Sequence, residues 1–469
     1  MKRILPFALA LAAGPEALAG PDVFRTERTL PQAPVSEARH GGVPCLFNGV
    51  QAELALDEAI ERMLCQDPQT RQAWAEAKAQ AAQMGVAWSA YLPRLGASVG
   101  ASDGRSRTDY LDFDGVETST RQKSLDARLD LSWVLFDFGK RRAALRSARH
   151  LLVAANASHD AILQNAFVNA AQVYYDALAA QDALAAAQQV KDMAEENFQA
   201  ADAKYRAGAA ALSDRLQAQT AASQSELRLV RARGNLDNAL GTLALRMGLA
   251  PDSELKLSSE LTPMPDTGFV GAIDRLLAQA RSHHPELIAA QARLDAAQEK
   301  VREARAEGRP TLALTGSLSH SRNDLPLALN GDTRQRDSSL GLQLNIPLFE
   351  GFERNYRVRG ARAQVEASRA ALAGAEQQVS LLVWGSYQRL MVDTRSLKST
   401  DALVEQSRQA LEVTRGRYRS GVGSMIELLN ALSAYADAQE QHIRALADWQ
   451  SARLQLAAGL GRLGFWALQ

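Results

Sequence analysis

The chain has 469 residues, of which 46% are hydrophobic and 23% charged, so it can bury one or more cores and is not a disordered tail. Lysine plus arginine equals aspartate plus glutamate at 53 each, so the overall charge indicates neither a nucleic-acid-binding protein nor attraction to an anionic membrane surface. Two cysteines, Cys45 and Cys65, are too few for a disulfide-built scaffold, and one bridge or two unpaired thiols both remain open.

Residues 1–19 have the pattern of a signal peptide, with basic Lys2 and Arg3, an apolar stretch and small residues before the expected cleavage site. The chain is therefore expected to cross the inner membrane. No later apolar run reaches about 18 residues, so we expect no membrane-spanning helix, and strands would have to form any part that crosses a bilayer. Cys45 lies too far from the cleavage site for lipid attachment, so we expect no lipid anchor. Residues 20–50 are predicted to be a polar extension.

An internal repeat is the most informative feature of the sequence. Many residues recur at an offset of 213 positions, and upstream of the strands the offset is 217. The recurring pairs include Leu131 and Leu344, Arg141 and Arg354, Tyr174 and Tyr387, Gly208 and Gly421, Gly248 and Gly461, Pro68 and Pro285, and Pro93 and Pro310. This pattern predicts two tandem repeats, 51–250 and 269–464, joined by a linker at 251–268 and followed by a tail at 465–469.

Each repeat is predicted to begin with one amphipathic helix, at about 53–90 and 270–306, followed by a short β-hairpin. Polar stretches at 101–122 and 319–337 separate the two strands of each hairpin. The second strand of each hairpin alternates apolar and polar residues, which is typical of a strand with one buried face. The side chains that we expect to face lipid are Leu125, Leu129, Leu131, Trp133, Leu340, Leu342 and Leu344.

Long proline-free, alanine-rich segments follow the strands, from residue 138 to 208 and from 352 to 421. As helices they would span roughly 100 Å, too long for a globular core, and their apolar spacing is that of coiled coils. A returning helix follows each turn. Four strands cannot close a barrel in lipid, so identical copies are expected to complete it. The predicted fold is mainly α with a small β part.

These residues resemble the TolC-like outer-membrane factor family over nearly the whole mature chain. The motifs are the turns Tyr205-Arg-Ala-Gly208 and Tyr418-Arg-Ser-Gly421, and the junctions Leu-Phe-Asp-Phe-Gly139 and Leu-Phe-Glu-Gly351. The resemblance implies a homotrimer with a twelve-stranded transmembrane β-barrel above a periplasmic α-barrel of helical hairpins. It implies an exit duct in the cell outer membrane that works with a periplasmic adaptor and an inner-membrane ABC or other transporter.

The resemblance also implies roles for residues near the two turns. The adaptor would dock at the turns, which contain Tyr205, Arg206, Gly208, Tyr418, Arg419 and Gly421. Tyr418 and Asp214 would hydrogen-bond between neighbouring coils in the closed state, and Glu427 and Asn430 match two positions of an acidic ring, the second amidated here. Some relatives carry a basic residue where this chain has Gly423, so one closing contact would be missing. The ordinary alternative is that Glu427 is a solvated helix residue.

Signals for an enzyme are weak, because the sequence lacks HExxH and CxxC spacings and a phosphate-binding glycine loop. We therefore assign no catalytic residues, no metal site and no cofactor, and we expect His283 and His284 to cap a helix or face solvent. A soluble periplasmic coiled-coil scaffold is the alternative from another class, but it leaves the apolar strand face uncovered. Among ducts, the missing lipid-attachment cysteine favours type I secretion of a protein or toxin over efflux of drugs.

Overall fold

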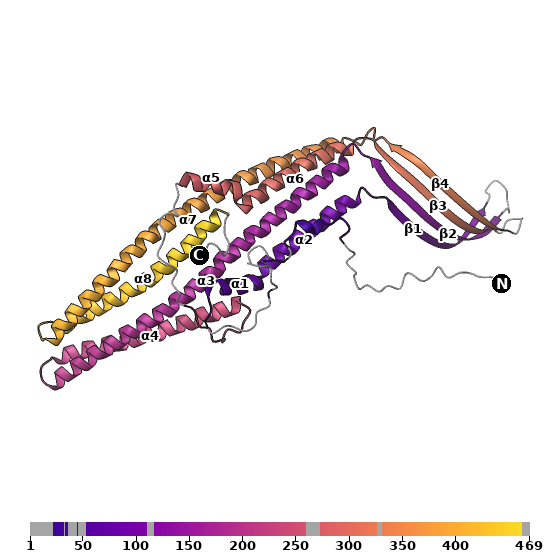
Figure 1. Ribbon diagram of the computed structural model, residues 1–469. Coiled ribbons are helices and arrows are strands. Elements are labelled where there is room, and N and C mark those ends of the chain that lie inside the picture. Colours follow the sequence, from indigo (N-terminus) through magenta and orange to yellow (C-terminus); the bar gives the residue numbers. More distant parts are fainter. Residues whose placement is uncertain are drawn as a thin grey trace.

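The computed structural model describes residues 22–31, 33–35, 45, 53–109, 117–258, 273–325 and 331–461. The predicted signal peptide and C-terminal tail lie outside these residues. Helices form an elongated body at one end of which a single sheet projects, and the tips of two helical hairpins lie at the other end (Figure 1). Among the described residues no helix is long and apolar enough to cross a membrane.

The first helical segment of each repeat is split in two, which corrects the prediction of one continuous helix. Helix α1 (Leu56–Gln66) is followed by α2 (Pro68–Ser89), and α5 (Ile273–His283) by α6 (Pro285–Glu307). The break arises because a residue before proline avoids the helical conformation: Asp67 has ψ 117° and His284 has ψ 124°. Both residues cap the following helix, since Asp67 accepts from Thr70 N–H at 2.8 Å and His284 from Glu286 N–H at 3.3 Å.

The long helices are confirmed. Helix α3 (Lys140–Arg206) and helix α7 (Glu353–Arg419) each contain 67 residues, about 100 Å at 1.5 Å per residue. Each returns through a shorter partner, α4 (Leu212–Arg246) or α8 (Met425–Gly459), both of 35 residues. Alanines on the facing sides, such as Ala194 and Ala201, are fully buried and let the helices pack closely. The two repeats therefore have the same order of elements.

The two predicted β-hairpins form one four-stranded antiparallel sheet in the order β1-β2-β3-β4. Strand β2 (Glu117–Phe136) of the first repeat pairs with β3 (Thr311–Leu325) of the second, while β1 (Arg94–Asp109) and β4 (Gly331–Asn345) form the edges. Residues directly opposite in the sheet share a face, so the register joins Leu129 to Leu318 and Leu314 to Leu342. The predicted apolar face is thus continuous across all four strands.

The strands are longer than the sequence suggested. The polar stretches 101–122 and 319–337, interpreted as connections, are mostly strand, and the pairing continues to Asp109 and Glu117 in one hairpin and to Leu325 and Gly331 in the other. Alternation of apolar and polar residues is required only where one face meets an apolar environment. Beyond that zone a strand can be polar on both faces, so its extension carries no apolar signal.

A tight junction connects strand β2 to helix α3. The Asp137 side chain, only 8% exposed, accepts hydrogen bonds from the Arg141 backbone N–H at 2.9 Å and from Arg141 Nε at 2.8 Å. Burial alone would raise the pKa of Asp137, but these hydrogen bonds and the Arg141 charge outweigh it and hold the pKa below its usual value. Arg141 also donates to the carbonyl of Val134 at 2.6 Å, so one ion pair fixes the change from strand to helix.

The described part of the N-terminal extension lies along the helices. The indole of Trp74 donates to the carbonyl of Pro31 at 3.0 Å, and Asn156 donates to the carbonyl of Thr29 at 2.9 Å. Cys45 and Cys65 form a disulfide, which resolves the alternatives left open by the sequence and ties the extension to helix α1.

Candidate functional site: the tips of the two helical hairpins

The two predicted turn motifs form matching helix ends at the tips farthest from the sheet (Figure 1). Gly208 and Gly421 have φ angles of 71° and 78°, which is the left-handed conformation that glycine adopts without steric cost. In the first turn Ala209 N–H bonds the carbonyl of Lys204 at 2.8 Å, and in the second Val422 N–H bonds that of Arg417 at 3.0 Å. Each glycine therefore ends its long helix with the same hydrogen-bond pattern.

Gly423 occupies the position where, by the family resemblance, some relatives carry a basic residue. A Cβ atom at this position would lie 3.0 Å from Arg417 Cβ and 3.1 Å from Tyr418 N, closer than side chains normally approach. Any side chain at residue 423 would therefore shift the turn against the end of α7.

Tyr418 is buried, with 5% of its surface exposed, although it belongs to the turn motif. Its hydroxyl has no hydrogen-bond partner among the described residues. Burial raises the pKa of the Tyr418 phenol, and the nearby Asp214 carboxylate raises it further. Asp214 thus lies close enough to act on Tyr418 electrostatically, but the two form no hydrogen bond within one protomer, so the predicted closed-state hydrogen bond stays a prediction.

Several charged contacts that the sequence did not predict connect the two hairpin tips. Lys204 Nζ on α3 donates to the Tyr418 carbonyl at 2.5 Å and lies 4.1 Å from the centroid of the Tyr418 ring. Glu196, also on α3, forms ion pairs with Arg419 and, at 3.7 Å, with Arg415 on α7. The internal repeat gave no signal for these residues, because the positions equivalent to Lys204 and Glu196 are Arg417 and Gln409.

Glu427 and Asn430 lie in the first turns of α8, on the exposed surface of the protomer. Ser424 caps this helix by accepting from Glu427 N–H at 3.3 Å, so the backbone of Glu427 has a structural role that its carboxylate does not share. The nearest cation to that carboxylate is Arg417, with Nη2 3.9 Å from Oε2. Glu427 is therefore free of a tight ion pair and keeps its charge exposed near the tip.

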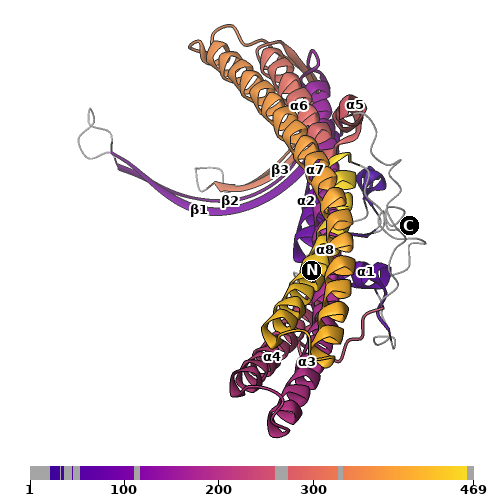
Figure 2. The same cartoon turned by 90° about the vertical axis from the view of Figure 1, so that its left-hand side faces the viewer.

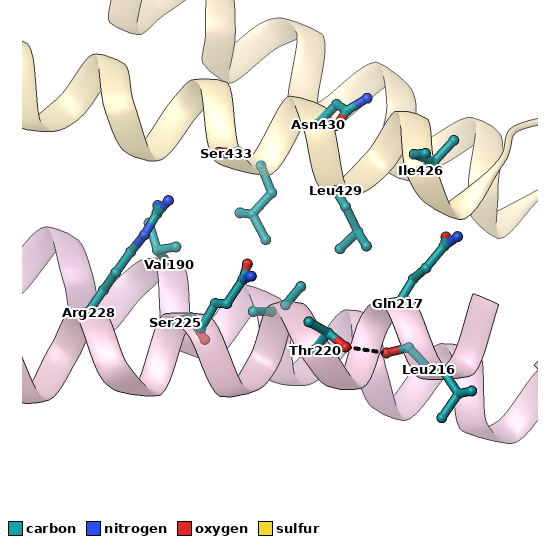
Figure 3. Close-up of a pocket in the computed structure, with 14 residues that line it drawn as sticks. Val190, Leu216, Gln217, Thr220, Ser225, Arg228, Ile426, Leu429, Asn430 and Ser433 are labelled. Carbon is teal, nitrogen blue, oxygen red and sulfur yellow. Dashed lines mark hydrogen bonds between the residues drawn. The ribbon is translucent and has the colours of Figure 1, made fainter. Parts of the chain in front are cut away.

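A groove of about 500 Å³ separates α4 from α8 just behind the tips (Figure 3). Val190 and Ala194 of α3 line the groove, and Leu429 points from α8 toward α4. Farther from the tip, Arg228 on α4 and Asp437 on α8 approach to 3.8 Å, which bridges the two hairpins. The two hairpins thus contact each other through charged residues near the tip and again at Arg228 and Asp437, and the groove lies between these two sets of contacts.

Most of the predicted docking residues are accessible. Tyr205, Arg206, Gly208, Arg419 and Gly421 are exposed at the tips. Tyr418 differs because its buried ring holds the turn against α3, so its side chain cannot face a partner in this conformation. Within the described parts of the chain, no group of three or more His, Cys, Asp or Glu side chains could hold a metal ion.

The family model described as outer membrane efflux protein matches residues 59–249 and 276–462. The chain belongs to the outer membrane efflux protein family. Among its curated relatives, protein CyaE of Bordetella pertussis is 36% identical over 417 residues, which cover 88% of this chain and 85% of that protein. The alkaline protease secretion protein AprF of Pseudomonas aeruginosa is 26% identical over 421 residues, covering 87% and 85% of the two chains.

Solved structures of other outer-membrane proteins share the fold. The outer membrane protein VceC of Vibrio cholerae superimposes with a TM-score of 0.73 at 21% identity, covering 87% of this chain and 96% of that one. The outer-membrane channel OprN gives a TM-score of 0.74 at 22% identity, with coverage of 88% and 90%. These likenesses show the fold, and the family match makes the chain an outer membrane efflux protein, located in the outer membrane with a large periplasmic helical part.

Proposed function

We propose that three copies of this chain form an exit duct, with twelve strands in a shared barrel and the long helices continuing the channel into the periplasm. The observation that carries this proposal is the sheet: one face is apolar across all four strands, and within the described residues β1 and β4 each pair on one side only. Open edges are not tolerated in lipid, so neighbouring copies have to pair with them.

The cargo in this proposal is a protein or toxin exported by a type I system, with an adaptor and an inner-membrane ABC transporter as partners. Two features support it. Both cysteines are in a disulfide, so neither can carry a lipid anchor. The name of one relative, the alkaline protease secretion protein AprF, refers to secretion of a protein, although another relative, OpmQ of Pseudomonas aeruginosa, is named for pyoverdine export. Efflux of small molecules is the second candidate.

The tips would form the periplasmic mouth. The adaptor would contact the exposed turn residues Tyr205, Arg206 and Arg419. The non-covalent contacts of Lys204 and Glu196 with α7 would hold the mouth closed at rest. In a trimer, three Glu427 side chains would converge near the axis and draw cations to the entrance. Asn430, one turn further along α8, would add no charge to this ring.

Membrane fractionation and channel recording test the proposal. The full-length protein should sediment with the outer membrane as a trimer that dissociates on heating, and the purified trimer should form ion-conducting channels in a planar bilayer. A soluble monomer in the periplasm would overturn the duct and favour the scaffold. To test the cargo, deletion of the gene should stop export of a secreted protein while sensitivity to drugs stays unchanged; the reverse result would identify an efflux channel.

A further inference from the structure

The face of the sheet that carries the apolar band changes its chemistry beyond Leu125, toward the hairpin ends. Register places Leu125 opposite Arg322 and Arg322 opposite Arg334. Since alternate residues of a strand share a face, the basic residues of this outer part all lie on the apolar side. They are Arg105, Arg107, Arg121, Lys123, His320, Arg322, Arg334 and Arg336, and we call them the basic collar.

The opposite face of the sheet has one basic residue at this level, Arg128, beside two carboxylates, Asp126 and Asp337. Its other positions toward the hairpin ends are small or uncharged: Gly100, Ser102, Gly104, Ser106, Gln122, Ser124, Ser321 and Gln335. A strand segment that was merely solvated on both sides would distribute its arginines over both faces. Seven of the eight lysine and arginine residues in this part of the sheet therefore lie on the face that meets lipid.

Like charges also meet directly across the strands of the collar. Arg105 lies opposite Arg121, and Arg322 lies opposite Arg334, an arrangement that destabilises a sheet unless anions neutralise it. Arg121 has such an anion in Asp103, at 2.5 Å. Register also places Asp109, Glu117, Asp324 and Asp332 at positions of the same face toward the hairpin ends, so seven lysine and arginine residues meet five carboxylates and two positive charges remain in excess.

The collar lies at the level of the lipid headgroups. From Leu125 to Leu135 the strand rises about 33 Å, and a tilt of about 45° reduces this to roughly 24 Å of height, close to the apolar band of outer-membrane barrels. The helices leave the sheet at the other end of this band, on the periplasmic side (Figure 2). Arg322, Arg334 and Arg336 therefore lie at the boundary between the hydrocarbon layer and the outer surface.

We propose that the basic collar binds the phosphate groups of lipids in the outer leaflet of the outer membrane. In that leaflet the phosphate carrier is lipid A, the anchor of lipopolysaccharide. Arginine suits this role because its planar guanidinium donates two parallel hydrogen bonds to a phosphate. The bound phosphates would place further negative charge beside the Arg322–Arg334 and Arg105–Arg121 pairs, and acyl chains would lie on the leucines of the band below.

Native mass spectrometry of the purified full-length protein in a neutral detergent, titrated with phosphorylated lipid A, tests the collar. The triple variant Arg322→Gln, Arg334→Gln and Arg336→Gln should bind lipid A about a hundredfold more weakly, since each basic residue near an anionic headgroup contributes about fivefold. The matched control is Arg128→Gln, which removes an arginine from the other face of β2 and should leave lipid A binding unchanged.

Three control experiments separate binding of the lipid A phosphates from other effects. Lipid A stripped of its phosphates should bind the wild type as weakly as the triple variant, and equal concentrations of inorganic phosphate should not displace lipid A. If the triple variant does not fold, as judged by its melting temperature without lipid, Arg334→Gln alone should weaken binding about fivefold. If wild type and variants bind lipid A equally, or if removing the phosphates from lipid A does not weaken binding, the proposed role of the basic collar is wrong. Neither result would affect the proposed duct.

Discussion

Lys204 and Tyr418 connect the two repeats at the tips of the hairpins: the ammonium lies 4.1 Å from the centre of the phenol ring and donates to the Tyr418 carbonyl at 2.5 Å. The carbonyl belongs to the last turn of α7, where backbone acceptors lack helical partners and a cation is favoured by the helix dipole. One lysine thus satisfies the end of α7 and covers the ring of a buried tyrosine.

Replacement of Lys204 by methionine should loosen the tips. The lost hydrogen bond and cation–π contact are together worth about 1 to 2 kcal/mol, so an open arrangement should become roughly tenfold more populated. We expect higher conductance of the resting channel in a planar bilayer and faster amide exchange at both turns. Lys191→Met, on the same helix but away from the tips, is the control. Conductance equal to wild type would show that Lys204 does not restrain the mouth.

Glu427→Gln should lower the cation preference of the channel, because the carboxamide keeps the size of the side chain and removes its charge. The helix should remain capped, since Ser424 accepts from the Glu427 backbone and not from its side chain. Reversal potentials in a salt gradient measure the preference. Glu440→Gln, an exposed residue farther along α8, should leave it unchanged. If both variants behave alike, Glu427 is an ordinary solvated residue.

The repeat pattern predicted the fold well because it depends on local chemistry. Gly208 and Gly421 each end a long helix in the left-handed conformation, and proline-free alanine-rich segments have few alternatives to helix. The strand-to-helix junction of each repeat also depends on local backbone conformation, but the two copies differ in residue order. Phe138 and Gly139 have φ angles of 51° and 94°, while Gly351 and Phe352 have 58° and 64°, so each copy places one glycine and one phenylalanine at two left-handed positions, in reversed order.

The hydrogen bond and ion pairs between the two hairpins could not be predicted from the sequence. Lys204 and Glu196 are ordinary surface residues on a helix, and their partners on α7 lie more than 200 positions away in the chain. Their pairing depends on how the two hairpins rotate against each other, which is set by packing along the whole helix. The length of the strands was missed for a different reason: the basic collar has no apolar alternation, so it looked like a loop.

The two repeats offer a matched test of burial at the strand-to-helix junction. Asp137 is buried and bonded to Arg141, whereas the equivalent Glu350 is exposed. Asp137→Asn should lower the free energy of unfolding by about 2 to 4 kcal/mol, because it leaves the partly buried Arg141 without its counter-ion, and Glu350→Gln by less than about 0.5 kcal/mol. Thermal melting of the purified protein measures both. Similar values for the two variants would contradict the role assigned to Asp137.

This contribution should also depend on pH. Because the folded-state pKa of Asp137 is held below its usual value, the stabilisation is present above the unfolded pKa, near 3.8, and is lost as pH falls through the lower folded value. The difference in melting temperature between wild type and Asp137→Asn should therefore shrink only in strong acid. A difference that disappears between pH 7 and 5 would mean that another group is responsible.

Asp448 on α8 lies near two other carboxylates, Asp176 on α3 and Asp393 on α7. Burial raises the pKa of Asp176 and Asp393, and the Asp448 charge raises both further, while Arg389 acts in the opposite direction on Asp393. Groups with a raised folded pKa stabilise the protein most at low pH and lose that stabilisation as pH rises through the folded value. Packing of α3 and α7 against α8 should therefore strengthen as pH falls below neutral.

Asp448→Asn tests this repulsion. At pH 7 the variant should melt at a higher temperature than wild type, because one of three like charges is gone and the ion pair it loses, with Arg389 at 3.9 Å, is exposed and weak. The gain should shrink as pH falls through the raised folded-state pKa values of Asp176 and Asp393, because these carboxylates then bind protons in the folded protein. Asp401→Asn, an exposed carboxylate on α7, should change neither value. A variant that melts lower than wild type at pH 7 would show that the Arg389 pair outweighs the repulsion.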